Sequence, residues 1–344
     1  MNHRLIAAIT LAKLVCTAGM HAQTDETIKV DTRLVSVPVI VSDRDGRYVP
    51  NLQQADFKVY QDGTEQKIGF FAASEEPVTV AILIDTGNST RDVLGDIKDS
   101  AKSFIKLLGP RDQAMIVSFD YDVHTLSPLT SDQEQLKTAI KHAEIPREFG
   151  TTLRDAVYQT VTASFKGIKR RKAIIVLTDG KDAGSFIRTP DLLYRLEESD
   201  TLIYTVMFKT GERAPRPVFD RGVFGGGFPG RNGRFPRGGG NFPRFPRERT
   251  ERQQQRQERQ KEQNAEAEVF LKKLSDTTAG RFFPSKNGKL KKTFAEILEE
   301  LRFQYRLGFY PPDDERPAIH QVRVRVERPN AVIRARTGYR SQPH

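Results

Sequence analysis

The chain has 344 residues, which is long enough for two domains or for one domain with a companion module. Apolar residues make up 37% of the sequence and support a buried core, whereas the single cysteine excludes internal disulfides and thiolate metal clusters. The formal net charge is +11, and most of it lies in residues 209–264, which contain 14 Lys and Arg against 6 Asp and Glu.

Residues 1–22 have the pattern of an export signal. Two basic residues precede an apolar run over residues 5–12, and small residues follow as far as Ala22. The apolar run is shorter than the roughly 20 residues that a membrane-spanning helix needs. A buried N-terminal helix is the alternative interpretation. We therefore expect an exported protein that is periplasmic, cell-surface or secreted, whose mature part lacks the only cysteine, Cys16.

Residues 28–73 alternate between apolar and polar positions, which is typical of half-buried strands. The run over 34–41 ends at an Asp-Arg-Asp-Gly turn signal. The run over 57–60 leads through Gln-Asp-Gly-Thr, a hairpin signal, into a returning strand over 66–71. These patterns predict the first part of a small antiparallel β module.

From residue 77 the pattern changes to apolar strands that alternate with amphipathic helices, which predicts an α/β fold. Because the strands are apolar throughout, we expect a doubly wound, mainly parallel, Rossmann-like sheet that is covered on both faces. The expected strands are 78–84, 114–119, 173–177 and 202–207, with residues 122–126 as a hairpin partner. The expected helices are 92–108, 133–143, 153–165 and 191–198.

An insert over residues 210–264 interrupts this α/β domain, which is predicted to extend over residues 77–303. The first part of the insert is rich in Gly, Phe, Pro and Arg and is expected to be flexible. The second part is rich in Gln, Arg and Glu and is either flexible or a solvated helix. An edge strand at 280–283 and a helix at 290–303 then complete the domain, and strands within residues 304–340 complete the β module.

Oxygen-bearing side chains follow two of the buried strands and occupy one further loop. Asp85 and Ser89 follow the first strand, Thr151 lies in a loop before a helix, and Asp179 follows the strand over 173–177. In open α/β sheets, ligands bind beyond the carboxyl ends of the strands, so these side chains are expected to converge there. Carboxylate and hydroxyl oxygens suit Mg²⁺ or a similar hard cation. The structural alternative is that Asp85 or Ser89 caps a helix and that Asp179 forms a turn.

The motif Asp85-x-Gly87-x-Ser89, with Thr151 and Asp179 in the same order along the chain, resembles the metal-ion-dependent adhesion site of von Willebrand factor type A (VWA) domains. The whole chain is similar to the VWA-related exported proteins typical of acidobacteria. In these proteins a β segment precedes the domain, and a Gln-Tyr-x-Leu-Gly-Phe-Tyr-Pro stretch follows it, here in the residues after Phe303.

The resemblance implies adhesion or ligand binding through a cation, Mg²⁺ or Mn²⁺. It implies four metal-binding residues, with Asp179 acting mostly through water: Asp85, Ser89, Thr151 and Asp179. The family has a serine where this chain has Gly87, so a water must replace one ligand and the affinity should be weaker. A cation held in this way keeps net positive charge. It can accept an Asp or Glu carboxylate of a protein partner as its last ligand.

Loops just outside the cation position are expected to form the ligand-binding rim and to set specificity. The candidate rim residues are Thr86, Gly87, Asn88, Thr90, Lys181 and Asp182. Phe149 and Arg154 flank the Thr151 loop and are also expected within reach of a partner. Each of these positions is also consistent with an ordinary solvated loop residue.

No catalytic constellation stands out, so we expect a binding protein and not an enzyme. The six histidines are scattered and lack metal-ligand spacing, and the Gly-rich runs do not lie between a strand and a helix. The basic insert offers an alternative function, a metal-independent VWA scaffold that binds anionic surface polymers or lipid head groups through residues 211–262. A simple spacer is the plainer interpretation of the insert. No nucleic acid partner is expected for an exported chain.

Overall fold

The computed structural model describes residues 34–73, 76–210, 247–285, 290–312 and 318–341. The predicted export signal and the Gly- and Phe-rich part of the insert, residues 211–246, lie outside these ranges. All described residues belong to one compact unit, Arg33–His344. The boundaries proposed between the α/β domain and the β module therefore stay predictions.

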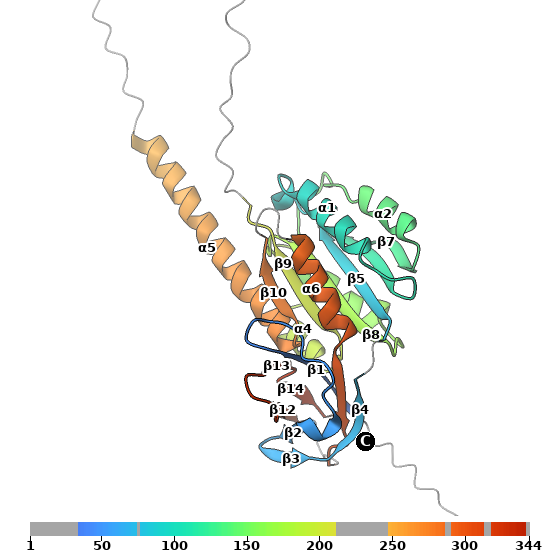
Figure 1. Ribbon diagram of the computed structural model, residues 1–344. Coiled ribbons are helices and arrows are strands. Elements are labelled where there is room, and N and C mark those ends of the chain that lie inside the picture. Colours follow the sequence, from blue (N-terminus) through green and yellow to red (C-terminus); the bar gives the residue numbers. More distant parts are fainter. Residues whose placement is uncertain (1–33, 74–75, 211–246, 286–289, 313–317, 342–344) are drawn as a thin grey trace, which may run out of the picture. The chain divides into compact units, whose positions relative to one another are not determined.

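A six-stranded sheet forms the centre of the α/β domain, as the apolar runs predicted (Figure 1). The strand order is β10-β9-β8-β5-β6-β7, and all neighbours are parallel except the antiparallel pair β6 and β7. Every residue of β5 is buried, because the sheet is covered on both faces. The strands are β5 (Val78–Asp85), β6 (Gln113–Phe119), β7 (Val123–Thr130), β8 (Arg171–Thr178), β9 (Leu202–Met207) and β10 (Arg281–Pro284).

Helices cover both faces of this sheet, so the predicted doubly wound arrangement is confirmed. Side chains of α1, α2 and α6 pack on one face, and those of α3, α4 and α5 pack on the other. The Asp132 carboxylate starts α2 by accepting the backbone N–H groups of Glu134 and Gln135, at 2.8 and 3.1 Å. The helices are α1 (Leu94–Ile105), α2 (Gln133–Lys141), α3 (Leu153–Gln159), which runs on into the π-helical turn η3 (Thr160–Ser164), α4 (Thr189–Glu197), α5 (Arg247–Thr277) and α6 (Leu290–Arg302).

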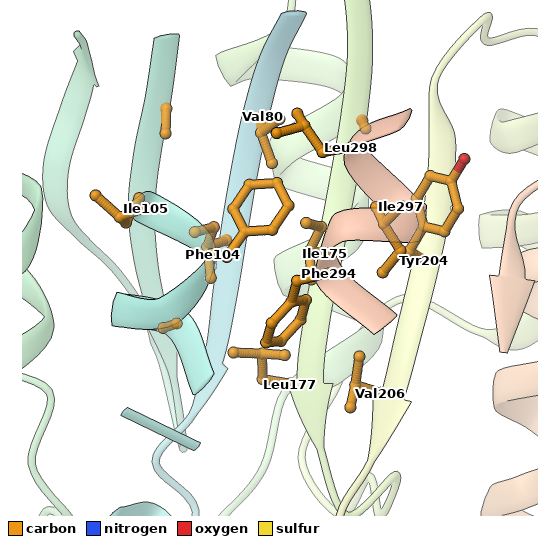
Figure 2. Packing of buried hydrophobic residues seen from close by; sticks show 14 of the residues in the cluster. Val80, Phe104, Ile105, Ile175, Leu177, Tyr204, Val206, Phe294, Ile297 and Leu298 are labelled. Atoms are coloured by element: carbon orange, nitrogen blue, oxygen red, sulfur yellow. The ribbon is translucent and has the colours of Figure 1, made fainter. Parts of the chain in front are cut away.

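The core beneath α1 and α6 holds these helices against the strands (Figure 2). Phe104 of α1 and Phe294 of α6 meet edge to face, with ring centroids 5.7 Å apart, and both are fully buried. Ile175 and Leu177 of β8 lie beside the two rings. This packing fixes the strand ends from which the polar loops start.

The terminal segments form two four-stranded antiparallel sheets instead of the single small sheet expected for the β module. Their strand orders are β13-β1-β11-β4 and β14-β12-β2-β3, so each sheet combines strands from both ends of the chain. Apolar side chains from both sheets share one core cluster. The elements are β1 (Val35–Ser42), η1 (Gln54–Asp56), β2 (Phe57–Gln61), β3 (Thr64–Gln66), β4 (Ile68–Ala72), β11 (Tyr305–Phe309), β12 (Ile319–Val326), β13 (Val332–Ala335) and β14 (Gly338–Arg340).

The single return strand predicted over residues 66–71 was wrong. The chain divides at Lys67: β3 pairs with β2, whereas β4 pairs with β11 in the other sheet. The reason is packing, because in this arrangement Ile68 and Phe71 of β4 pack against the core that the two sheets share.

The Gln/Arg/Glu-rich part of the insert is helical, which decides between the two alternatives that the sequence left open. It forms the first half of α5, and the second half docks on the sheet through Ala267, Leu271 and Leu274. In the region between, Gln260 Nε2 donates a hydrogen bond of 3.2 Å to the Thr210 carbonyl. Among the residues that the structure describes, no helix combines the length and apolar character needed to cross a bilayer.

Candidate functional site

The carboxyl ends of β5 and β8 carry the two predicted carboxylates, and both are fully buried. Asp85 is the last residue of β5, and Asp179 follows β8 directly. One Asp85 oxygen accepts the Thr178 hydroxyl at 2.5 Å, and the other accepts the Gly87 backbone N–H at 2.9 Å. The two carboxylates are close enough for their charges to interact. The predicted convergence is therefore present for Asp85 and Asp179.

Burial raises the pKa of Asp85, and the negative charge of Asp179 raises it further, to about 8. Hydrogen bonds from Thr178, Gly87 and the Asp179 backbone act in the opposite direction but do not cancel the effect. A carboxyl group in this setting is stabilised by a proton or by a cation. The site therefore favours a positively charged ligand on electrostatic grounds.

Lys181 provides part of the positive charge. Its Nζ lies 2.9 Å from Asp179 Oδ2 and 2.7 Å from the Thr210 hydroxyl, which itself donates to Asp179 Oδ2 at 2.9 Å. Lys181 was predicted as a rim residue that contacts a partner. The structure places it as the counterion of Asp179, with its side chain about one-fifth exposed.

Gly87 brings the Thr151 hydroxyl against the Asp85 loop. A Cβ atom built on Gly87 would lie 2.3 Å from Thr151 Oγ1 and 3.0 Å from Asp85 Oδ1, so both oxygens face the same point. The Thr151 hydroxyl fills the space that a serine at position 87 would need, and it donates to the Gly150 carbonyl at 2.8 Å. The replacement of serine by glycine thus changes the packing of the site as well as its donor count.

Ser89 lies in the short 3₁₀ turn η2 (Asn88–Thr90) that follows β5. Its hydroxyl is buried and has no hydrogen-bond partner among the described residues. Buried hydroxyls are normally satisfied, and an unsatisfied one costs about 1–3 kcal/mol. The orphaned hydroxyl fits a site that is completed by a ligand.

The predicted rim residues divide into buried and accessible groups. Thr86 and Thr90 are fully buried: Thr86 donates to Asp120, and Thr90 donates to the carbonyls of Asp85 and Gly87. Asp182 accepts the Arg154 backbone N–H at 2.9 Å. Burial does not fit the rim position expected for Thr86 and Thr90, and Asp182 is only half-buried; the hydrogen bonds of all three residues hold the loops in place.

Asn88 and Gly87 have different roles in the same loop. The Asn88 amide donates to the Glu148 carbonyl at 3.0 Å and so ties the first loop to the segment before Thr151. Gly87 is itself buried and offers a partner only backbone. Asn88 is half-exposed.

Two residues of the site were missed by the sequence interpretation. Asp120 follows β6 and accepts the Thr86 hydroxyl at 2.8 Å, while His124 lies 3.2 Å from its other oxygen. Thr178 is the other, and it holds the Asp85 carboxylate. The signal for both was present, because each lies at the carboxyl end of a predicted strand in the same way as Asp85.

The residues present fit a hard divalent cation. Within the described ranges no cluster of three His, Cys, Asp or Glu side chains is arranged for a metal ion, so a cation here must use hydroxyl groups beside carboxylates. Asp85, Ser89 and Thr151 offer that donor set, and the raised pKa of Asp85 and the buried Ser89 hydroxyl are both compatible with it.

Residues 80–181 match the sequence model of the von Willebrand factor type A domain family, and this part of the chain is a VWA domain. The matched segment contains all four predicted metal-binding residues. The family assignment agrees with the resemblance found in the motif and points to protein binding or adhesion. A comparison with curated protein sequences gave no match.

Several solved structures are similar to the chain. An aerotolerance-related membrane protein from Bacteroides fragilis, with multiple mutations to serine, has 18% identity and a TM-score of 0.43 over 65% of this chain and 98% of its own. Proximal thread matrix protein 1 from the mussel byssus, with a zinc-occupied MIDAS motif, has 15% identity and a TM-score of 0.45 over 69% and 48%. The vWF domain of the type V pili tip protein Mfa5 from Porphyromonas gingivalis has 24% identity and a TM-score of 0.28 over 31% and 39%. The family assignment rests on the sequence match, because all three TM-scores lie below 0.5.

Proposed function

We propose that this protein is an exported binding protein, not an enzyme, whose VWA domain engages a protein partner through a divalent cation. The observation that carries the proposal is the presence, in one loop, of a buried Asp85 with a raised pKa and a buried Ser89 hydroxyl that has no partner among the residues the structure describes. Both features are unfavourable in the free chain and both are relieved by one cation. The proposal of export rests on the pattern of residues 1–22.

Each residue has a definite part in this function. Asp85, Ser89 and Thr151 would hold Mg²⁺ or Mn²⁺, and Asp179 would act through water. The cation would supply a position that accepts an Asp or Glu carboxylate from the partner. The hydrogen bonds from Thr178 and Gly87 keep the Asp85 carboxylate in place, and the Lys181 ammonium neutralises part of the charge of Asp179 in the absence of the cation.

Calorimetric titration of Mg²⁺ and Mn²⁺ into the purified protein tests the proposal. We expect binding of one ion to the natural chain, loss of binding in Asp85→Ala, and weaker binding in Asp179→Ala. Asp99→Asn is a matched control, because Asp99 is an exposed carboxylate of α1. Its titration should equal that of the natural chain. A flat trace for both ions with the natural chain would contradict the proposal.

A further inference from the structure

Three aromatic side chains are exposed on loops at the candidate site. Tyr121 is 45% exposed, Phe149 is 86% exposed and Phe186 is 93% exposed. Tyr121 follows β6, Phe149 precedes the Thr151 loop, and Phe186 lies in the loop between β8 and α4. Single exposed apolar residues are ordinary, but aromatic side chains that gather on the loops of one site mark an interaction surface. We call these three residues the aromatic rim.

The exposure of Phe186 is imposed by the fold. Its backbone N–H donates to Asp155 Oδ2 at 2.9 Å, and the N–H of Ile187 donates to Asp155 Oδ1 at 2.8 Å. Asp155 is buried, and Ile187 packs against the core cluster on that face of the sheet. The loop is therefore fixed on both sides of Phe186, and its ring is presented to solvent without loss of loop order.

The segment that carries Phe149 packs closely against the Tyr121 backbone. A Cβ atom on Gly150 would lie 2.9 Å from Tyr121 Cα, so the segment that contains Phe149 lies directly on the Tyr121 backbone. The hydrogen bond from Asn88 to the Glu148 carbonyl fixes the other side of Phe149.

The loop that carries Phe186 contacts the Thr151 loop, which Phe149 precedes. The backbone N–H groups of Ala183 and Gly184 donate to the Thr151 carbonyl at 3.0 and 3.1 Å, which ties the Phe186 loop to the residue two positions after Phe149. The loops that carry Phe149 and Phe186 thus meet at Thr151, a predicted cation ligand.

We propose that the aromatic rim docks a protein segment in which one acidic side chain is flanked by apolar or aromatic side chains. This inference rests on the proposed function, because the acidic side chain is taken to bind at the cation position. Chemical complementarity supports this occupant: the cation selects a carboxylate, and the ordered aromatic rings select apolar neighbours. Exposed charges on the same loops have both signs, as at Arg91, Glu148 and Asp122, so they do not form the basic surface that an anionic membrane would select.

Selection of a phage-displayed library of random dodecapeptides on the full chain tests the inference. The natural chain, with Mn²⁺ present, is compared with the double variant Phe149→Ser/Phe186→Ser. Ile319→Ser is the matched control, because Ile319 is an exposed apolar residue of β12. We expect the natural chain and the control to enrich peptides with an Asp or Glu flanked by apolar residues. A synthetic peptide of that consensus should bind the double variant at least tenfold more weakly.

Titration of Mn²⁺ into the double variant separates loss of the rim from loss of the site, since its affinity for the ion should be unchanged. Enriched peptides that carry an acidic residue without apolar neighbours, or that bind the double variant equally well, would contradict the inferred role of the aromatic rim but not the proposed metal site. Peptides that bind Asp85→Ala as tightly as the natural chain, or no enrichment that depends on Mn²⁺, would overturn the proposed function together with the rim. Binding to phosphatidylcholine/phosphatidylglycerol vesicles in EDTA that is lost in the double variant would overturn the inference in favour of a lipid surface.

Discussion

The buried Asp85 carboxyl group should make the metal-free protein less stable as the pH rises. In the unfolded chain its pKa is near the ordinary value of 3.8, whereas in the folded protein it is about 8. At a pH between 3.8 and about 8, Asp85 of the folded state holds a proton that Asp85 of the unfolded state has released. The contribution of Asp85 is therefore fully present below pH 4 and is lost as the pH rises through about 8.

The magnitude follows from one proton. The free energy of unfolding should fall by about 1.4 kcal/mol for each pH unit, or by about 3 kcal/mol between pH 5 and pH 7.5. Urea unfolding followed by circular dichroism in EDTA, at several pH values, measures this slope. Asp85→Asn cannot titrate at this position, so the difference in slope between the natural chain and the variant isolates Asp85 from the other carboxyl groups.

A divalent cation should remove the effect, because it replaces the proton. Saturating Mn²⁺ should therefore stabilise the natural chain more at pH 7.5 than at pH 5, and it should not stabilise Asp85→Asn at either pH. Equal slopes for the natural chain and for Asp85→Asn in EDTA would refute the argument from the buried carboxyl group.

Three further predictions concern packing and charge. Gly87→Ser should destabilise the metal-free protein by about 1–3 kcal/mol in urea unfolding, because the new Cβ atom meets the Thr151 hydroxyl. The same variant should bind Mg²⁺ more tightly in calorimetry, because serine adds an oxygen ligand. Unchanged Mg²⁺ affinity would contradict this second effect. Lys181→Met should raise Mn²⁺ affinity about tenfold, since it removes an ammonium that competes for Asp179, and weaker Mn²⁺ binding in the same titration would disprove this. Phe294→Ala should lower the free energy of unfolding by about 3–5 kcal/mol, as measured in urea, because it leaves a cavity beside Phe104; a loss below 1 kcal/mol would show that the core relaxes around it.

The central sheet could be predicted because buried parallel strands are apolar at every position, a pattern that is local in the sequence. The positions of Asp85 and Asp179 at strand ends followed from the same pattern. The path of β4 could not be predicted, since the alternation in residues 64–72 is the same whichever sheet the strand joins. Its partner β11 lies more than 200 residues further along the chain.

The residues of the ligand-binding rim and of the aromatic rim were harder to predict, because their positions depend on tertiary contacts. Thr86 and Thr90 lie between predicted metal ligands and read as loop residues, but the tight 3₁₀ turn directs Thr90 back to the Asp85 carbonyl. The pairing of Lys181 with Asp179 depends on side-chain packing that sequence spacing does not show. Phe149 was identified from its place beside Thr151. Phe186 was missed, because its exposure depends on the buried partner of its backbone, Asp155.

The pairing of N-terminal with C-terminal strands in the same sheets has a consequence for folding during translation. β1 hydrogen-bonds to β11 and β2 to β12, so these two strands cannot pair until the ribosome has made the chain as far as β11 and β12. A product terminated before Tyr305 would retain the strands from Val78 to Pro284 but would expose the unpaired flanks of β1 and β2. Unpaired strand flanks promote aggregation, so chaperones that hold the nascent N-terminal segment and proteases that remove incomplete chains would act on these first two strands.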